Sequence, residues 1–328
     1  MNEQIINQFK LLIKQIKFDI DFSTGKTQLI NMYRLRSILA VLKVLEKYPT
    51  KIKSSKELSN IKGIGKKSLA RIDEILKVGK LSEIKISEDI DKYLNIISEL
   101  EDVFGIGRKK AYELFKKHDI KSIDDLKKKY DNKEIELPDN IAKGLKYVGQ
   151  IKEKIPREEI DKLQNILVSA TLEIDPQLFG VVCGSYRRES VVSNDVDFII
   201  VYTGKTNNNT NYIKIFVNLL KNKKIIIDSL TSEDVPTKYM GIYKLNDSTP
   251  LRRIDIRYVS YESFYSAILY FTGSKDFNRK MRQIALDMGY VLNEYGLFDQ
   301  NKKMFSVKSE KDIFEILGME YVTPNRRN

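Results

Sequence analysis

Hydrophobic side chains recur at three- and four-residue spacing through residues 2–86, which is the pattern of amphipathic helices. The first stripe consists of Ile5, Ile6, Phe9, Leu12, Ile13 and Ile16, and Lys10, Lys14 and Lys17 lie mostly off it. A stripe of this width buries one helix face against other helices. We therefore favour an ordinary bundle helix over a helix that faces a membrane or DNA. Residues 87–148 have the same helical pattern.

The pattern changes after Pro156, where short β-branched and aromatic segments alternate with helical stretches. The clearest of these segments are 196–202, 225–227 and 254–259. Alternation of this kind predicts strands and helices within one domain. The second half of the chain is therefore expected to have a mixed α and β fold.

Two aspartates stand in the first strand-like segment, in the run SNDVDFIIVY. Side chains two residues apart on a strand face the same side. Asp195 and Asp197 should therefore project together, while Val196 and Phe198 turn into a core.

A third aspartate, Asp255, stands in the run RRIDIRYV. There Ile254, Ile256 and Tyr258 share one face, and Asp255 and Arg257 share the other. An adjacent strand can thus offer a third carboxylate to the metal ions bound by the first two. Hard oxygen ligands of this kind suit Mg²⁺, which keeps positions for water and substrate phosphates. The sequence predicts a preformed clamp for divalent metal ions.

A Gly-Ser turn and two arginines, in the run GSYRR, precede the aspartate pair by the length of one loop. The turn at Gly184 and Ser185 offers N–H and hydroxyl donors, and arginine offers a fork of donors that matches phosphate oxygens. A triphosphate pocket is favoured over a plain turn with surface arginines.

Composition narrows the class of partner. The 328 residues include 42% hydrophobic side chains, enough for two or three folded domains. A net charge of +12 favours a polyanion, with nucleic acid ahead of a membrane surface. No apolar stretch approaches the ~18 residues of a membrane span, so we expect a soluble, intracellular protein. The single cysteine excludes an internal disulfide framework, and the single histidine argues against triad hydrolysis. We expect Cys183 to be buried and His118 to lie on the surface.

An internal repeat divides the helical half. KGIGKKSLARI begins at Lys62, and FGIGRKKAYEL begins at Phe104, 42 positions later. A Gly-Ile-Gly turn that opens a helix presents backbone N–H groups at the positive end of the helix dipole, where they can hold a phosphate. Two such turns predict helix-hairpin-helix elements on a nucleic-acid backbone, through Gly63, Gly65, Lys66, Gly105, Gly107, Arg108 and Lys109.

Ordered matches to one protein family extend from the N-terminal helices almost to the C-terminus. The matching runs are YPTKIKS, GIG with RIDE, the second GIG, GLKYVG, IPREE, VCGSYRR, DVDF, RRIDIR, YFTGS with FNRKMR, LNEY and SEKDIF. On these runs the chain resembles the DNA polymerase beta-like proteins of DNA polymerase family X.

The resemblance implies a multidomain α plus α/β fold. Two helix-hairpin-helix motifs lie in N-terminal helical domains, followed by a nucleotidyltransferase-type palm with a mixed sheet and a small C-terminal α+β subdomain. The implied parts are a lyase-type domain that binds a DNA 5′ end, a thumb-like subdomain, the palm and a nucleotide-selecting, fingers-like subdomain, at residues 1–86, 87–148, 149–262 and 263–328.

The implied activity is DNA-directed DNA synthesis that fills short gaps in base excision repair, by two-magnesium nucleotidyl transfer. Mn²⁺ is the substitute metal, and Na⁺ or K⁺ is the ion expected at the helix-hairpin-helix turns. The implied partners are gapped or nicked double-stranded DNA, deoxynucleoside triphosphates, and DNA ligase or other repair proteins, with no membrane and a monomeric chain. Nuclear, cytoplasmic and viral-factory locations all stay open.

The resemblance assigns the site residues as follows. Asp195 and Asp197 hold both metal ions, and Asp255 joins them at the ion that faces the primer terminus, where it accepts or relays a proton. Gly184, Ser185 and Arg188 contact the triphosphate, as does Lys154, which stands where the family has arginine.

Further assignments come from the run YFTGSKDFNRKMR. Tyr270 and Phe271 crowd the sugar of the incoming nucleotide, and Gly273 allows the backbone to approach that sugar. The other assignments are a base-edge contact for Asn278, template contacts for Arg279 and Arg282, and a DNA-backbone contact for Arg253.

The first repeat departs from the family at Arg71, where a lysine normally forms a Schiff base with 5′-deoxyribose phosphate. A guanidinium group does not lose its proton and therefore cannot be that nucleophile. Lys67, one helical turn earlier, is the substitute nucleophile if lyase activity survives, and Arg34 and Arg71 are expected to bind the 5′-phosphate by charge.

Two alternatives stay open. The chain could add nucleotides without a template, or it could be a non-catalytic scaffold that binds DNA ends through its two helix-hairpin-helix units. The three aspartates and the Gly-Ser turn argue against the scaffold.

Overall fold

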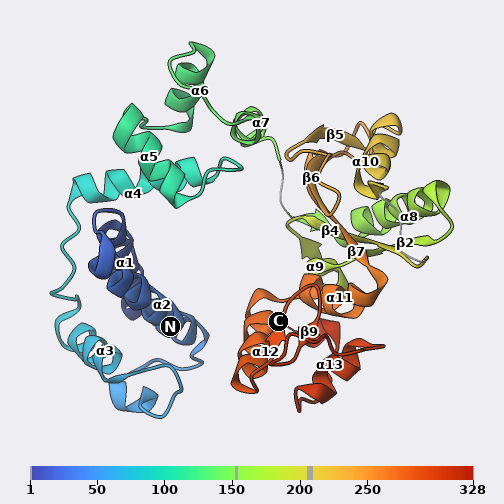
Figure 1. The fold of residues 1–328 in the computed structure, drawn as a ribbon. Helices are drawn as coiled ribbons and strands as arrows, with labels where there is room; N and C mark the ends of the chain where they lie inside the picture. Colours follow the sequence, from blue (N-terminus) through green and yellow to red (C-terminus); the bar gives the residue numbers. More distant parts are fainter. Residues whose placement is uncertain (1, 152–153, 205–209, 328) are drawn as a thin grey trace. The chain divides into compact units, whose positions relative to one another are not determined.

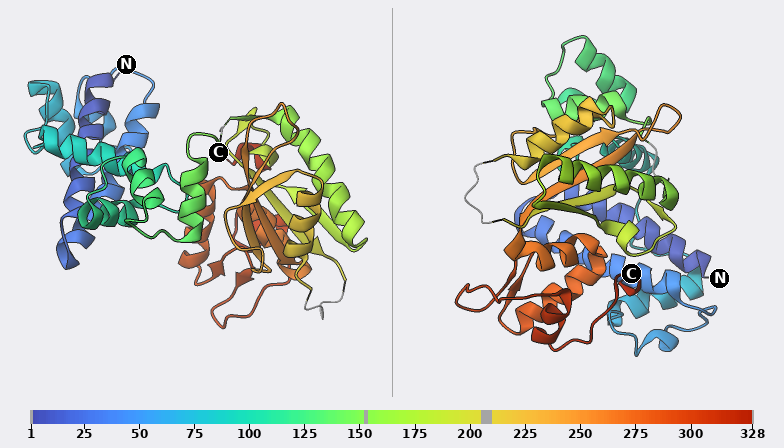
Figure 2. Two further views of the ribbon diagram at one scale, coloured as in Figure 1. Left: turned by 90° about the horizontal axis from the view of Figure 1, so that it is seen from above. Right: turned by 90° about the vertical axis from the view of Figure 1, so that its right-hand side faces the viewer.

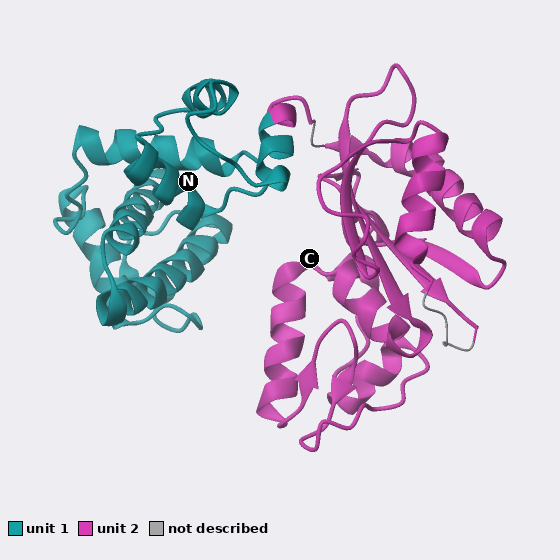
Figure 3. Ribbon diagram, turned by 45° about the horizontal axis from the view of Figure 1, so that its top comes forward, with its two compact units in different colours: residues 1–145 teal, residues 146–328 magenta. Residues whose placement is uncertain are grey.

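The structure is a computed structural model that describes residues 2–151, 154–204 and 210–327. Its helices and strands are labelled in Figure 1. The chain divides into two compact units, Met1–Leu145 and Lys146–Asn328, which are shown in different colours in Figure 3. Each unit is described separately below.

Unit 1 is helical, as the periodicity predicted. Its elements are α1 (Glu3–Asp21), α2 (Gly25–Lys47), the 3₁₀ helix η1 (Ser55–Leu58), α3 (Lys66–Val78), α4 (Glu88–Glu101), α5 (Arg108–His118), α6 (Ile123–Asp131) and α7 (Asp139–Tyr147), whose last two residues belong to unit 2.

The hydrophobic stripe of α1 forms the centre of the first core. Phe9, Leu12 and Ile16 are fully buried, together with Ile38 of α2 and Ile72 of α3. The lysines off the stripe remain outside this core. The predicted bundle helix is therefore confirmed.

A second cluster joins α1 to the helices of the second repeat. The ring of Tyr93 on α4 makes edge contacts with Phe18 and Phe22, at centroid distances of 5.6 and 5.2 Å. Its hydroxyl donates to Asp21 Oδ2 at 2.8 Å. The carboxylate of Asp21, at the end of α1, therefore joins α1 to α4.

Unit 2 has mixed α and β structure, as predicted. Its strands are β1 (Ile155–Pro156), β2 (Leu178–Val182), β3 (Val192–Ser193), β4 (Val196–Tyr202), β5 (Ile226–Ser229), β6 (Lys238–Tyr243), β7 (Arg252–Ser260), β8 (Val291–Leu292) and β9 (Leu297–Phe298). Its helices are α8 (Arg157–Ile174), α9 (Gly184–Arg187), α10 (Tyr212–Asn222), η2 (Tyr261–Ser263), α11 (Phe264–Thr272), α12 (Lys275–Asp287), α13 (Glu310–Ile316) and η3 (Pro324–Arg326).

The main sheet has five strands in the order β2-β4-β7-β6-β5. Strands β4 and β7 are parallel, and the other neighbours are antiparallel. One face carries Phe198 and Ile256 into a core with α8 and α10, while Ile199 and Val201 pack on the opposite face against α11. Figure 2 shows the sheet with helices on both of its faces. Successive strand residues alternate between these two cores because the side-chain period is two.

The C-terminal part of unit 2 has its own core between α11, α12 and α13. Met281, Ile313 and Phe314 are fully buried there. Arg327 is also fully buried and lies over the rings of Phe277 and Phe314.

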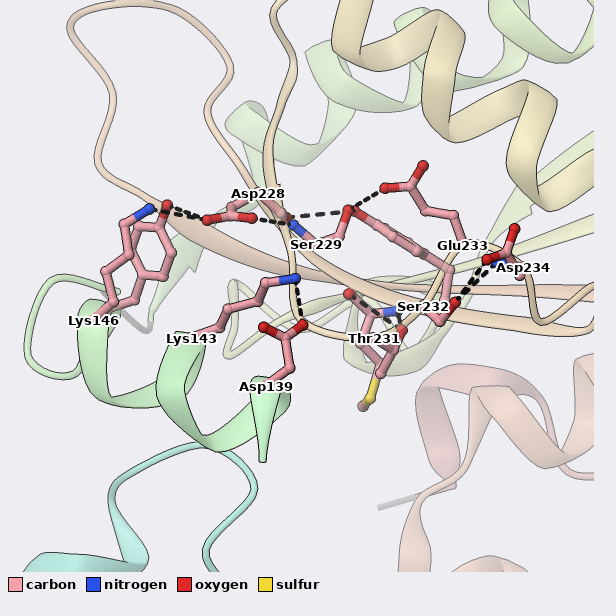
Figure 4. A network of polar contacts seen from close by, with 12 residues as sticks. Asp139, Lys143, Lys146, Asp228, Ser229, Thr231, Ser232, Glu233 and Asp234 are labelled. Atoms are coloured by element: carbon pink, nitrogen blue, oxygen red, sulfur yellow. Dashed lines mark hydrogen bonds and ion pairs between the residues drawn. The ribbon is translucent and has the colours of Figure 1, made fainter. Parts of the chain in front are cut away.

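Polar contacts join the beginning of unit 2 to the edge strand β5, as Figure 4 shows for Lys146 and Asp228. The Ser229 hydroxyl at the end of β5 donates to Glu233 in the loop that follows (Figure 4). The Tyr147 hydroxyl donates to Asp228 Oδ2 at 2.7 Å, and Lys146 Nζ lies 3.1 Å from the same oxygen. Although burial by itself raises the pKa of Asp228, these hydrogen bonds hold that pKa below its ordinary value.

Two of the smaller predictions are confirmed. The Cys183 thiol is buried, and His118 is exposed at the end of α5. Within the described ranges, none of the helices has the length and apolar character that a membrane crossing requires.

Candidate active site

The parallel pairing of β4 and β7 brings two of the predicted aspartates together. Asp197 and Asp255 are direct partners in the register of this pair. Their neighbours Val196, Phe198 and Ile254 are almost fully buried on the other face of the sheet. The predicted alternation therefore places both carboxylates on the face that carries α11.

Gly184 lies directly against this pair. It opens the short helix α9 with a φ of +59°, and a Cβ atom added here would come within 2.3 Å of Asp197 Oδ2. The backbone N–H of Cys183 donates to the Asp197 carbonyl at 2.8 Å. Only glycine combines this left-handed conformation with this close approach.

Burial and mutual repulsion perturb the carboxylates. Burial raises the pKa of Asp197 to about 7, and the charges of Asp195 and Asp255 add to the rise. Burial also raises the pKa of Asp255 to about 6, against the opposing charge of Arg253. Such shifts arise when several acids converge with incomplete neutralisation.

Arg253 contacts two of these acids, and the charge of Arg257 also acts on Asp197 and Asp255. The Arg253 guanidinium group pairs with Asp195, and its Nε lies 3.7 Å from Asp255 Oδ1. The preformed metal clamp expected from the sequence is therefore not present as such. Among the described residues, no three His, Cys, Asp or Glu side chains are gathered closely enough to hold a metal ion. Arg253 stands two residues from Asp255 on β7 and so shares its face, but the alternation of side chains did not predict its ion pair with Asp195.

The donor set nevertheless fits a divalent cation. Asp255 Oδ1 is buried and accepts no hydrogen bond within the described structure. Asp195 and Asp197 line a cavity beside it. Carboxylate oxygens of this kind are the ligands that Mg²⁺ and related hard cations take.

The cavity has a volume of about 440 Å³, within the usual range for small-ligand sites. Its walls combine the Gly-Ser turn and Arg188 with the end of α11, the start of α12 and the two residues between them. It contains these predicted residues: Gly184, Ser185, Arg188, Asp195, Asp197, Tyr270, Phe271, Gly273, Asn278 and Arg282. Residues predicted from two distant runs therefore share one site.

Hydrogen bonds from side chains to backbone carbonyls order the end of α11 and the turn that follows it. Arg188 Nη1 donates to the Thr272 carbonyl at 2.7 Å, and Asn278 Nδ2 donates to the Tyr270 carbonyl at 2.6 Å. The Tyr270 ring lies edge-on to Phe271, and the Arg282 guanidinium lies 5.8 Å from the Tyr270 centroid. These contacts hold the aromatic side chains at the cavity wall.

Several residues of the site were not assigned from the sequence. Thr272, Ser274 and Lys275 also line the cavity. Arg187 turns away from it and binds Glu310 at 2.6 Å, and Arg327 Nη1 donates to the same carboxylate at 2.6 Å. The two adjacent arginines of GSYRR thus point to different partners, which no sequence pattern distinguishes.

The two Gly-Ile-Gly turns have the predicted backbone but different surroundings. Gly65 and Gly107 precede the first residues of α3 and α5, and neither helix has a side-chain N-cap hydrogen bond. No atom lies within 4 Å of a Cβ added at Gly63, whereas at Gly105 it would meet the side chain of Asn140 at 2.7 Å.

The basic residues of the turns also differ. Lys66, Lys67 and Lys109 are exposed. Arg108 instead binds Asp21 through Nε and Nη2, at 3.0 and 2.6 Å. The sequence did not indicate this ion pair, because its partner lies 87 positions away.

The remaining predicted residues are distributed as follows. Lys154 is exposed, with a φ of +64°, and Arg279 lies 3.9 Å from Asp276 in an exposed pair. Arg34 and Arg71 both bind the carboxylate of Glu83. Neither the sheet nor the cavity includes these residues.

Three protein-family models match the chain. They are the DNA polymerase beta palm at residues 154–261, the DNA polymerase beta thumb at residues 267–328 and a helix-hairpin-helix domain at residues 2–81. The thumb model matches the C-terminal part of the chain, for which the resemblance implied a fingers-like subdomain at residues 263–328.

Curated relatives match most of the chain. DNA polymerase lambda of Arabidopsis thaliana is 29% identical over 92% of this chain and 60% of its own length. DNA polymerase lambda of Rattus norvegicus is 28% identical, over 90% and 52% respectively. DNA nucleotidylexotransferase of Xenopus laevis is 25% identical, over 91% and 64%. The chain thus spans between about half and two thirds of the length of these relatives.

The matched regions include the first of the two Gly-Ile-Gly turns, the paired aspartates and the whole cavity wall. The chain is a DNA polymerase beta-like protein of DNA polymerase family X.

Proposed function

We propose that this chain is a DNA-directed DNA polymerase that fills short gaps in DNA repair. One observation carries the proposal: the parallel strands β4 and β7 set Asp197 beside Asp255, next to a cavity lined by a Gly-Ser turn and Arg188. Acids and phosphate donors that line one nucleotide-sized cavity are what nucleotidyl transfer requires.

Asp195, Asp197 and Asp255 would hold two Mg²⁺ ions, with Mn²⁺ as a substitute. When bound, two such cations would lower the pKa of the primer 3′-hydroxyl and neutralise charge on the entering and leaving oxygens. Arg253 would have to release Asp195, and it could then bind the DNA backbone. Its side chain is the positive charge now nearest to the carboxylates.

The proton of the primer hydroxyl goes to Asp255 in this proposal. Its Oδ1 is buried and accepts no hydrogen bond in the described structure, so it has a lone pair free to accept a proton.

The cavity wall selects the nucleotide. Arg188, Ser185 and Gly184 would bind the triphosphate, with Lys154 as a further cation. Tyr270 and Phe271 would crowd the sugar, and Gly273 would allow the backbone to approach it. Asn278 would meet the base edge, and Arg279 and Arg282 the template.

Unit 1 would bind the DNA. In this proposal residues 1–86 contact a 5′ end and residues 87–148 the duplex, while 149–262 and 263–328 form the palm and the nucleotide-selecting part. Gapped DNA and deoxynucleoside triphosphates are the substrates, and Na⁺ or K⁺ would bind at the Gly-Ile-Gly turns. The active form would be a monomer that cooperates with DNA ligase or other repair proteins.

Primer extension on a one-nucleotide gap tests the proposal. We expect a single templated addition that requires a divalent cation, and the absence of any extension would refute it.

The match to DNA nucleotidylexotransferase favours a second candidate, addition without a template. The same primer without its template strand separates the two. Templated synthesis predicts loss of activity, and the second candidate predicts that activity persists.

Lyase activity would require a nucleophile other than Arg71. The exposed Lys67 is the candidate, one helical turn earlier on α3. Borohydride trapping of an abasic-site adduct should disappear in Lys67→Ala, and unchanged trapping would exclude this residue.

A further inference from the structure

Four charged side chains form a cluster in unit 1, outside the cavity. Arg34 of α2 and Arg71 of α3 bind Glu83, which lies in the segment after α3. Asp19 of α1 lies 3.8 Å from Arg34 Nη1. Two positive and two negative groups therefore balance one another.

Glu83 is held by a fork of donors. Arg71 donates through Nε to Oε1 and through Nη2 to Oε2, the latter at 3.2 Å. Arg34 Nη2 donates to the same Oε2 at 2.7 Å. Two guanidinium groups that converge in this way fit any anion with adjacent oxygens, and a phosphate fits as well as a carboxylate.

This cluster is open to solvent. The side chains of Arg34 and Glu83 are each 31% exposed, and that of Arg71 is 16% exposed. The hydrogen bond from Arg71 holds the pKa of Glu83 below its ordinary value, so its carboxylate stays charged at neutral pH. An anion that approaches Arg34 and Arg71 therefore finds both guanidinium groups already bound to Glu83.

We propose that Glu83 is an internal competitor for a DNA 5′-phosphate at the anion site formed by Arg34 and Arg71. The inference rests on the proposed function, since it assumes that unit 1 meets DNA ends. A 5′-phosphate enters this site only by displacing the carboxylate, and Glu83 therefore sets how strongly the chain distinguishes a phosphorylated end from a hydroxyl end.

Equilibrium binding of the full chain to two gapped DNAs tests this proposal. The DNAs differ only in a downstream 5′-phosphate or 5′-hydroxyl, and the readout is the ratio of their dissociation constants. We expect a ratio within about threefold of one for the wild type and about tenfold higher discrimination for Glu83→Gln. A general loss of structure would weaken binding of both DNAs and leave the ratio unchanged.

Asp89→Asn is the control for net charge, because Asp89 is exposed on α4 and has no ion pair in the described structure. Its ratio should match that of the wild type. If Glu83→Gln folds and its ratio is unchanged or falls, the proposal is wrong.

Glu83→Asp decides the matter if Glu83→Gln does not fold. The shorter side chain keeps the charge but cannot reach both arginines, so the ratio should rise about threefold; an unchanged ratio would overturn the proposal. Inorganic phosphate should weaken the binding of the 5′-phosphate DNA and leave the binding of the 5′-hydroxyl DNA unchanged. Equal weakening of both DNAs would indicate a general anion site and not a site for a DNA end. These binding ratios need no catalysis, so an inactive wild-type chain would refute the proposed function without deciding the role of Glu83.

Discussion

The carboxylates of β4 and β7 and the arginines around Glu83 are two places where like charges converge, and they are balanced differently. In unit 2, Arg253 and Arg257 lie near the three acids, yet burial still raises the pKa of Asp197 and Asp255, and a buried oxygen of Asp255 accepts no hydrogen bond within the described structure. In unit 1, Arg34 and Arg71 are matched by Asp19 and Glu83. The first arrangement leaves negative charge for an external cation, whereas the second is already satisfied by its own side chains.

This difference indicates which of the two clusters an external ligand would stabilise more. A cluster with surplus charge is stabilised by binding a counter-ion, while a balanced cluster must first lose an internal partner. The following substitutions test the comparison, beginning with the largest expected effect.

Removing one acid from the unbalanced cluster should cost the most. Asp255→Asn should lower single-turnover nucleotide incorporation by about 10³-fold, because charge stabilisation and the proton acceptor are lost together. Asp228→Asn is the matched control on the same sheet, and it should stay within about threefold of the wild type. Near-normal incorporation by Asp255→Asn would remove this residue from the mechanism.

A methyl group at Gly184 should disturb the same cluster sterically. Gly184→Ala places a Cβ against Asp197 Oδ2, and we expect about a 100-fold loss of incorporation by the folded protein. Gly318→Ala is the control, because Gly318 has a similar φ of +63° with no atom within 4 Å. It carries the backbone strain alone and should leave incorporation within about twofold. Equal losses in both variants would show that strain, and not the contact with Asp197, matters.

The pH dependence of stability should have opposite signs for Asp197 on β4 and Asp228 on β5. The pKa of Asp197 is raised to about 7, so the folded chain binds this proton more tightly than the unfolded chain. Its contribution is fully present below about pH 4 and is lost as the pH rises through about 7.

Without divalent cations, Asp197→Asn should therefore raise the free energy of unfolding at pH 8 by about 2 kcal/mol. Asp228→Asn should lower it, because the pKa of Asp228 is depressed. Chemical unfolding at pH 5 and pH 8 measures both changes. A destabilised Asp197→Asn at pH 8 would contradict the surplus of negative charge.

The balanced cluster should show the smallest effect. The depressed pKa of Glu83 means that its ion pairs stabilise the fold above about pH 4.5 and cease to do so as the pH falls through the folded pKa. Glu83→Gln should cost about 1 kcal/mol at pH 7, and this cost should shrink as the pH falls below about 4.5. A cost that does not change with pH would mean that Glu83 acts through packing.

The sequence predicted what depends on periodicity. The faces of β4 and β7 follow from alternation, which correctly placed Val196 and Phe198 in the core and Asp197 and Asp255 on the opposite face. The bundle stripe of α1 and the helix starts after Gly65 and Gly107 follow from equally local rules.

These local rules did not predict the ion pairs that long side chains form. Arg253 reaches Asp195 and Asp255, and Arg108 reaches Asp21, because flexible arginines find carboxylates that tertiary packing brings close. The contact between Gly184 and Asp197 is likewise tertiary. Glu83 belongs to no motif, so nothing in the sequence pattern indicated that it holds two arginines.

Diffraction from crystals soaked in Mn²⁺, with gapped DNA and a non-hydrolysable nucleotide bound, tests the central claim most directly. We expect anomalous peaks in contact with the carboxylates of Asp195, Asp197 and Asp255, and Arg253 displaced from Asp195. A fully formed nucleotide complex in which Arg253 still binds Asp195 and no anomalous peak lies among the three carboxylates would contradict the account.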